Sequence, residues 1–242
     1  MTREFFAGID KITLGLDDSF KFHCTMCGAC CVNRDDIMLN PRDVYRIAKY
    51  LEMEPVEFFK SYCSYYIGDS SRMPIVKLNA VGPMKRCPLL KGKQCAVQSV
   101  KPSVCALFPL GRYMKFETEN FTPENIAKGQ VRYMLQDVDC GDKSETHTVR
   151  EWLKDFDIAT ADETYIQWNI AIAEIGRLLK KAEKCMSEKT MEIVWGAALS
   201  ALYLNYSTED EFLPQFKQNV KEISAVLSLV DLAEVQEDGV KL

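Results

Sequence analysis

The chain has 242 residues, of which 47% are hydrophobic and 27% charged, as is typical of a globular protein with one large domain or two small ones. Its formal net charge of -5 at pH 7 argues against a nucleic-acid partner, because proteins that grip phosphates usually carry a basic excess. We therefore expect no nucleic acid among its partners.

We find no pattern of a targeting or membrane segment. The first 20 residues mix acidic and basic side chains and contain no apolar core of signal-peptide length. The longest nearly apolar run, residues 193–204, is shorter than the roughly 20 residues that a membrane span requires. We expect a cytoplasmic protein with no membrane partner, in which the ten cysteines are reduced ligands or redox groups rather than a disulfide scaffold.

The first feature along the chain is a cluster of four cysteines within eight positions, at Cys24, Cys27, Cys30 and Cys31. A Cys-x-x-Cys pair lets two thiolates turn back on one metal ion, and Gly28 permits a tight backbone between two such pairs. Side chains of adjacent residues diverge, so we do not expect Cys30 and Cys31 to serve one mononuclear ion equally well. The cluster therefore favours two metal centres, or one polynuclear cluster with a second site.

A helix and several short strands are predicted next. Asn40 is a good N-cap, Pro41 suits the first helical position, and apolar residues then recur on one helical face, at Val44, Ile47, Ala48 and Leu51. Alternating patterns predict short strands at 74–82, 112–118 and 131–138. We expect these strands to form a small antiparallel sheet.

From residue 148 onward the pattern is helical. Thr148 with Glu151, and later Thr208 with Glu211, have the spacing of a capping box. Three apolar stripes at helical spacing follow, at 165–179, 191–202 and 212–227. We interpret them as packing faces rather than cofactor sites, because an amphipathic helix needs such a face to pack.

The predicted fold class is therefore α+β. We expect a cysteine-rich metal-binding region with short strands and a helix at residues 1–145. A mainly α-helical C-terminal support, residues 146–242, is predicted to pack on it.

Further thiols follow the first cluster at Cys87, Cys95, Cys105 and Cys140, and bring the set of candidate metal ligands to eight, which is enough for two sites of four. The segment 85–112, which includes Cys87, Cys95 and Cys105, contains no acidic residue. It contains six basic residues: Lys85, Arg86, Lys91, Lys93, Lys101 and Arg112. A cationic segment beside thiols lowers their pKa and offsets the charge of a thiolate-bound centre.

The remaining candidate ligands are few. Only His23 and His147 offer imidazoles, and we expect the first to be a flanking surface residue and the second to be structural. Cys63 and Cys185 lie outside the motif blocks and are predicted core thiols. A thiolate-rich site selects zinc, copper(I) or an iron–sulfur cluster rather than magnesium or calcium.

The order of the cysteine blocks resembles the CxxCxxCC (YkgJ-type) cysteine-cluster family, a zinc- or iron-chelating domain. The blocks are CxxCxxCC, then CPL, GKQC, KPSVCALFP and a late cysteine followed by HTVREWL, over roughly residues 20–155. Flagellin lysine methylases carry a similar cysteine motif, and this similarity implies an iron–sulfur cluster and methyl-transfer chemistry. Two departures are Lys101, where the family usually has arginine, and Cys140, which lacks the proline that commonly follows it there.

The leading functional interpretation is a metal-binding protein whose eight motif thiols hold an iron–sulfur cluster, of the 4Fe-4S type. Zinc is the alternative metal, since both accept four thiolates. Zinc would make the chain a structural module or a metal carrier. A cluster-dependent, protein-modifying methyl-transfer enzyme is a further alternative, weakened by the absence of nucleotide-loop, nucleophile-elbow and paired His/carboxylate motifs. We expect a protein partner or a protein substrate.

Overall fold

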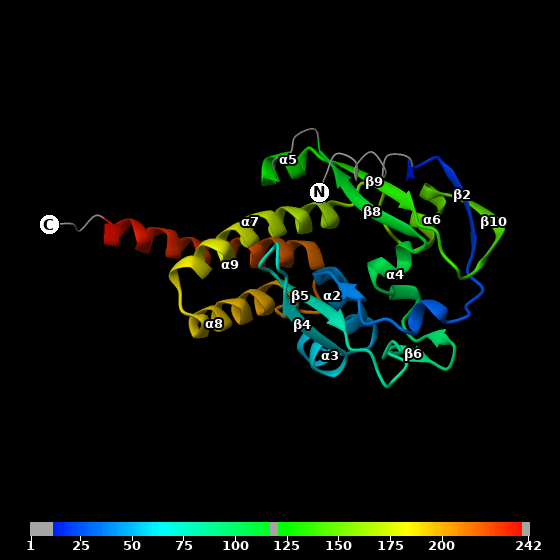
Figure 1. Ribbon diagram of the computed structural model, residues 1–242, viewed down its shortest axis with the longest axis horizontal. Coiled ribbons are helices and arrows are strands. Elements are labelled where there is room, and N and C mark those ends of the chain that lie inside the picture. Colours follow the sequence, from blue (N-terminus) through cyan, green and yellow to red (C-terminus); the bar gives the residue numbers. More distant parts are fainter. Residues whose placement is uncertain (1–11, 117–120, 239–242) are drawn as a thin grey trace.

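The computed structural model describes residues 12–116 and 121–238, with strands concentrated in the first part of the chain and long helices in the last part (Figure 1). This arrangement confirms the predicted α+β class. The N-terminal eleven residues and the end of the predicted strand 112–118 lie outside the described residues. None of the described helices has the length and apolar character needed to cross a membrane.

The described residues of the first part of the chain form short elements. In chain order they are β1 (Thr13–Leu14), β2 (Ser19–His23), η1 (Ala29–Cys31), β3 (Met38–Leu39), α2 (Pro41–Tyr50), α3 (Pro55–Tyr62), β4 (Cys63–Ile67), β5 (Pro74–Leu78), β6 (Leu90–Lys91), β7 (Gln94–Cys95), η2 (Gln98–Val100), α4 (Ser103–Leu107), β8 (Leu110–Lys115), α5 (Pro123–Ala127), β9 (Gln130–Leu135) and β10 (Asp142–Thr148).

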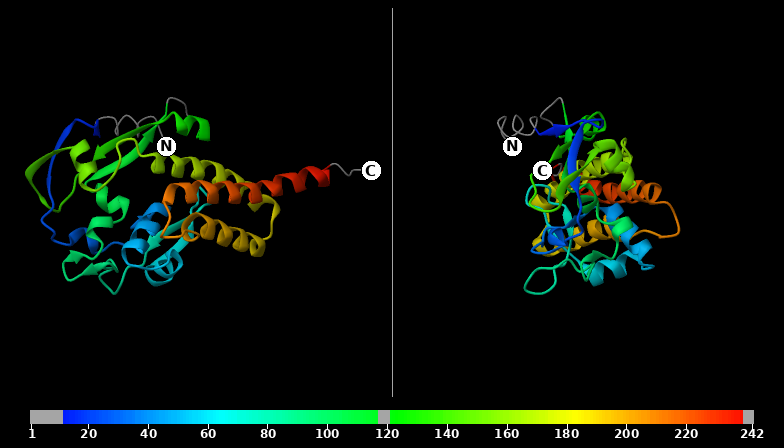
Figure 2. Two further views of the ribbon diagram at one scale, coloured as in Figure 1. Left: turned by 180° about the vertical axis from the view of Figure 1, so that it is seen from behind. Right: turned by 90° about the vertical axis from the view of Figure 1, so that its right-hand side faces the viewer.

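The last part is helical, as the apolar stripes predict. Its elements are α6 (Val149–Asp155), α7 (Glu163–Cys185), α8 (Glu188–Leu199), the π-helical turn η3 (Ser200–Leu204) and α9 (Phe212–Asp238). Helices α7 and α9 lie side by side, and α9 extends beyond the rest of the molecule (Figures 1 and 2).

The described strands form four small antiparallel sheets instead of one: β1-β9-β8, β10-β2, β3-β5-β4 and β6-β7. β8 and β9 pair as predicted, with Arg112 opposite Tyr133. The expectation that β5 joins them is wrong, because β5 pairs on one side with β3 and on the other with β4, two strands that the sequence analysis did not predict.

Two of the three predicted helix starts are confirmed by their caps. The Asn40 side chain accepts a hydrogen bond from Asp43 N at 2.9 Å, and the Asp43 carboxylate accepts one from Asn40 N at 3.1 Å. Thr148 and Glu151 make the same reciprocal pair at 3.2 and 2.8 Å. Each box satisfies two backbone donors that a helix N-terminus leaves without partners.

The third start is wrong, because α9 begins only at Phe212, so Thr208 is not its N-cap. The segment before it is held instead by Gln215, whose side chain accepts from Ser207 N at 2.8 Å and donates to Ser207 O at 3.0 Å. These two hydrogen bonds between α9 and the loop before it take the place of the predicted capping box.

The buried side chains form two cores. The larger core joins α2, α3 and the β3-β5-β4 sheet to α7, α8, η3 and α9, so the C-terminal helices pack on the first part of the chain. The smaller core contains Phe20 and Phe22 of β2, Tyr133 of β9, and Trp152 and Leu153 of α6. Helix α6 therefore packs with N-terminal strands, and the domain boundary at residue 145 stays a prediction.

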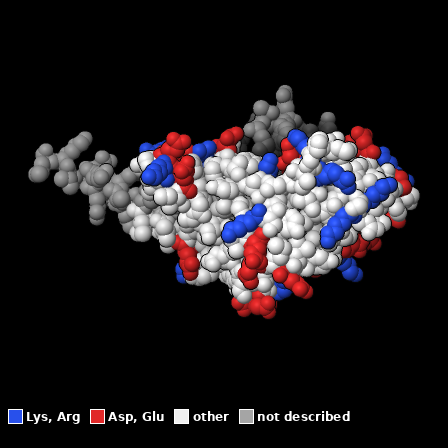
Figure 3. All heavy atoms as spheres, turned by 90° about the horizontal axis from the view of Figure 1, so that it is seen from below, with Lys and Arg blue, Asp and Glu red and all other residues white. Residues whose placement is uncertain are grey.

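The molecular surface in Figure 3 carries both basic and acidic side chains, separated by broad areas with neither. Basic groups on this face stand beside acidic or uncharged ones, so this face presents charges of mixed sign.

The shared large core predicts that Leu202→Ala destabilises both parts of the chain. Leu202 in η3 is fully buried between helices of the two parts, so its truncation should cost about 2–5 kcal/mol of unfolding free energy. Denaturant unfolding measures this loss, and amide exchange should show reduced protection in α2 as well as in α9. The control Ile193→Ala, at a side chain that is 69% exposed, should stay within about 0.5 kcal/mol. Loss of protection in α9 with α2 unchanged would contradict the shared core.

Candidate metal centre

Backbone hydrogen bonds join the two loops that carry most of the candidate ligands. Cys87 N donates to Cys31 O at 2.8 Å, and Asn33 N donates to Met84 O at 3.0 Å. Gly28, with φ 76°, lets the first loop turn, and a β-carbon there would lie 3.7 Å from the carbonyl oxygen of Lys93. The first cysteine cluster therefore lies directly on the loop that follows Cys87.

A short hairpin brings Cys87 and Cys95 together. Cys95 in β7 lies opposite Leu90 in β6, and Leu90 N donates to Cys87 O at 3.1 Å. The turn between the strands contains Gly92 with φ 62°. These two cysteines, eight residues apart in sequence, thus face the same region.

Cys105 is positioned by a buried carboxylate. Asp43, in the first turn of α2, accepts hydrogen bonds from Ser103 N at 2.9 Å and from the Ser103 hydroxyl at 2.7 Å. Ser103 begins α4, which carries Cys105. Burial raises the pKa of Asp43, and its hydrogen bonds with Ser103 and with the Asn40 backbone oppose that effect. These hydrogen bonds thereby join α2, which packs in the larger core, to α4, which carries Cys105.

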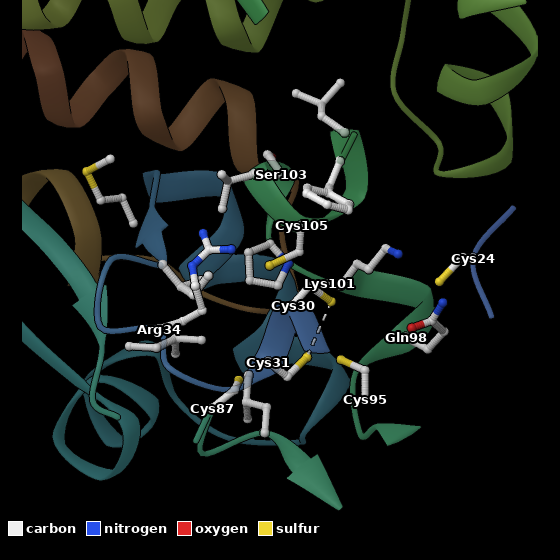
Figure 4. Close-up of a pocket in the computed structure, with 18 of the residues that line it drawn as sticks. Cys24, Cys30, Cys31, Arg34, Cys87, Cys95, Gln98, Lys101, Ser103 and Cys105 are labelled. Carbon is white, nitrogen blue, oxygen red and sulfur yellow. Dashed lines mark hydrogen bonds between the residues drawn. The ribbon is translucent and has the colours of Figure 1, made fainter. Parts of the chain in front are cut away.

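A cavity of about 700 Å³ opens between these elements. Figure 4 shows thiols from separate segments directed into one region, with Cys24 standing apart on the β2 side. Apolar side chains such as Ile37 and Phe108 share the lining with the basic Arg34 and Lys101. Six of the eight predicted ligands line this cavity: Cys24, Cys30, Cys31, Cys87, Cys95 and Cys105.

Cys27 and Cys140, the other two predicted ligands, are outside the cavity lining. Cys140 lies just before β10, and the backbone of Gly141 makes a hydrogen bond with the Cys27 thiol. Asp142 in β10 lies opposite His23, the residue before Cys24. Gly141, at φ 72°, brings the backbone so close that a β-carbon would meet His23 O at 2.5 Å. Burial raises the pKa of Cys140, and so does its proximity to the thiols of Cys30, Cys27 and Cys24.

The cavity thiols differ in their readiness to ionise. A hydrogen bond from Cys31, whose Sγ lies 3.8 Å away, lowers the pKa of Cys30 to about 6, and Lys101 adds to this effect. The same hydrogen bond raises the pKa of Cys31. Burial raises the pKa of Cys87, and that of Cys105 to about 12. Of these four thiols Cys30 therefore has the most favoured thiolate, and a bound cation would favour loss of the proton from Cys31, Cys87 and Cys105.

The donor set suits a soft metal. The cavity lining contains one carboxylate, Asp36, which accepts a hydrogen bond from Arg34 Nε at 2.5 Å. In the part of the chain that the structure describes, no three His, Cys, Asp or Glu side chains already converge as a closed metal-ligand group. The thiols therefore share one region, and their side chains would have to move closer together to form a coordination shell around zinc or an iron–sulfur cluster.

For the cysteines and histidines outside the predicted ligand set, the structure agrees with some of the predictions and contradicts one. Cys63 is buried in the larger core, as predicted. The core prediction for Cys185 is wrong: it ends α7, is exposed, and its thiol donates to Lys181 O at 3.2 Å. His147 Nε2 lies 3.0 Å from Phe22 O, which agrees with a structural role.

Two features of the site were missed by the sequence analysis. The first is the Asp43 contact with Ser103, which joins residues 60 positions apart and gives no local sequence signal. The second is Glu145, whose carboxylate lies 2.7 Å from His23 Nδ1 and 3.4 Å from His147 Nε2. The alternation of His147 and Glu145 in one strand was a signal for this contact, because residues two apart share a face.

Comparison with known proteins agrees with the cysteine pattern. Residues 23–130 match the family model CxxCxxCC, described as "Putative zinc- or iron-chelating domain". Searches of curated proteins and of solved structures gave no match. The matched range contains seven of the eight predicted ligands, all except Cys140. The resemblance to this family is thereby confirmed over residues 23–130, the range that the family model matches.

Proposed function

We propose that this chain is a metal-binding protein whose thiol-rich region holds an iron–sulfur cluster of the 4Fe-4S type. The observation that carries the proposal is the lining of one cavity by six cysteines, with Lys101 and Arg34 beside them and a single carboxylate. Thiolates are the ligands of such clusters, and nearby cations offset the negative charge of a thiolate-bound centre. The family description supports iron or zinc as the metal.

The cavity has room for a polynuclear cluster. Its volume is about 700 Å³, and the six thiols line it together with apolar and basic side chains. Zinc in a structural or carrier role is the alternative for the same ligands. We also propose that the chain binds a protein partner or acts on a protein substrate.

Metal and sulfide analysis of protein purified without oxygen tests this proposal. We expect a coloured protein that contains iron and acid-labile sulfide, because a thiolate-bound cluster carries both. Cys105→Ser should lower the iron and sulfide content, since a hydroxyl is a poor ligand for a soft metal. The matched control is Cys185→Ser, which alters an exposed thiol at the end of α7 and should leave the content unchanged. Colourless protein with zinc and neither iron nor sulfide would contradict the cluster.

The same cavity favours a second candidate function, a cluster-dependent enzyme that transfers a methyl group to a protein. Its volume of about 700 Å³ falls within the range of roughly 300–1,000 Å³ that is typical of small-molecule sites. Beyond the thiols the lining includes polar side chains such as Gln98, Gln136 and Tyr165. A methyl donor would bind there, beside the metal centre.

Calorimetric titration with S-adenosylmethionine tests this second candidate. Binding to the metal-loaded protein is the expected result, and Met38→Trp should weaken it because a large ring at this lining position reduces the cavity volume. Met38 is about half exposed and is not a candidate ligand, so the metal content should stay constant. Ile193→Trp, on exposed α8, serves as the control and should leave binding unchanged. No binding to protein with intact metal would favour a purely binding or structural role.

A further inference from the structure

We infer that the eight thiols form two unequal centres. The inner set is Cys31, Cys87, Cys95 and Cys105, and the outer set is Cys24, Cys27, Cys30 and Cys140. The inner centre retains its metal, whereas the outer centre exchanges metal with the solution. This inference rests on the proposed function, and it adds a division of labour that the family description does not contain.

The inner set is anchored in the larger core. The hydrogen bond from Cys87 N to Cys31 O and the β6-β7 hairpin hold three of its backbones together. Cys105 is tied to α2 through Ser103 and the buried Asp43. Cys87, Cys95 and Cys105 also pack directly against the larger core, and all four inner thiols are partly buried. Release of a metal from this set would require movement of several anchored elements.

The outer set is supported in a different way. Cys24, Cys27 and Cys30 are exposed, unlike every member of the inner set. Cys140 approaches them through the two-stranded β2-β10 ribbon, at Gly141. Three exposed thiols and the partly buried Cys140, on a loop and beside a ribbon, give solvent and chelators access to any metal bound between them.

The boundary between the inner and outer sets lies between the adjacent residues Cys30 and Cys31. Their Sγ atoms are 3.8 Å apart, which by itself also fits one tetrahedral ion, because bonds of about 2.3 Å place ligand sulfurs about 3.8 Å apart. Both residues lie in η1, a 3-10 turn in which successive side chains point about 120° apart. The Cys31 backbone is hydrogen-bonded to Cys87, and residue Cys31 as a whole is less exposed than Cys30. These contacts assign Cys31 to the inner set.

The test measures metal before and after exposure to excess EDTA, followed by gel filtration and elemental analysis. The wild-type protein should lose a distinct fraction of its metal quickly and keep the rest, because the outer ligands are the more accessible ones. The triple variant Cys24→Ser, Cys27→Ser and Cys140→Ser should start with the retained fraction alone and lose no more. Two of its three positions, Cys24 and Cys27, are exposed, and circular dichroism checks the fold of the variant.

Single variants at the boundary sharpen the assignment. Cys30→Ser should abolish the EDTA-sensitive fraction alone, and Cys31→Ser should abolish the EDTA-resistant fraction. Cys185→Ser is the control and should behave as wild type. If the wild type loses all metal in one phase, or if the triple variant holds none, the two-centre inference is overturned while metal binding stands. Wild-type protein that never binds metal would overturn the proposed function itself.

Discussion

The thiol region depends on a small set of backbone hydrogen bonds between two loops that have little apolar burial of their own. In the described stretches 24–36 and 79–88, no residue is fully buried. Contacts such as Cys87 N to Cys31 O hold these loops in register. Hydrogen bonds of this kind contribute about 1 kcal/mol each, so they define the approach of the loops without making it rigid. A metal bound by thiols from both loops would supply the missing stability.

Helix α2 connects the helical core to the thiol region and positions part of that region. Its apolar face packs in the larger core, where Val44, Ile47 and Ala48 are fully buried. Its first turn presents Asp43 to Ser103, so the same helix orients α4 and with it Cys105. On the other side, the Arg112 guanidinium in β8 meets the Asp162 carboxylate at 2.6 Å, where both side chains are almost fully buried. The cavity is thus framed by elements whose positions are fixed elsewhere.

Local sequence patterns predicted several of the helices, whose formation depends on residues close together in the sequence. The caps at Asn40 and Thr148 and the three C-terminal stripes follow from short-range spacing, and the structure contains the corresponding helices. The cysteine blocks likewise predicted the matched family. The sheets were harder to predict, because the partner of β5 depends on β4, a strand rich in tyrosine that follows α3 directly. The Asp43 to Ser103 contact joins distant residues, and the exposure of Cys185 depends on where α7 ends.

The central claim is that metal completes the fold of the thiol region. Amide exchange of the protein with and without its metal, measured in the absence of oxygen, tests this claim directly. Metal removal should reduce protection in residues 24–36 and 79–105, and helices α7 and α9 should keep theirs because they pack in the larger core. Unchanged protection across the thiol region after complete metal removal would contradict the account.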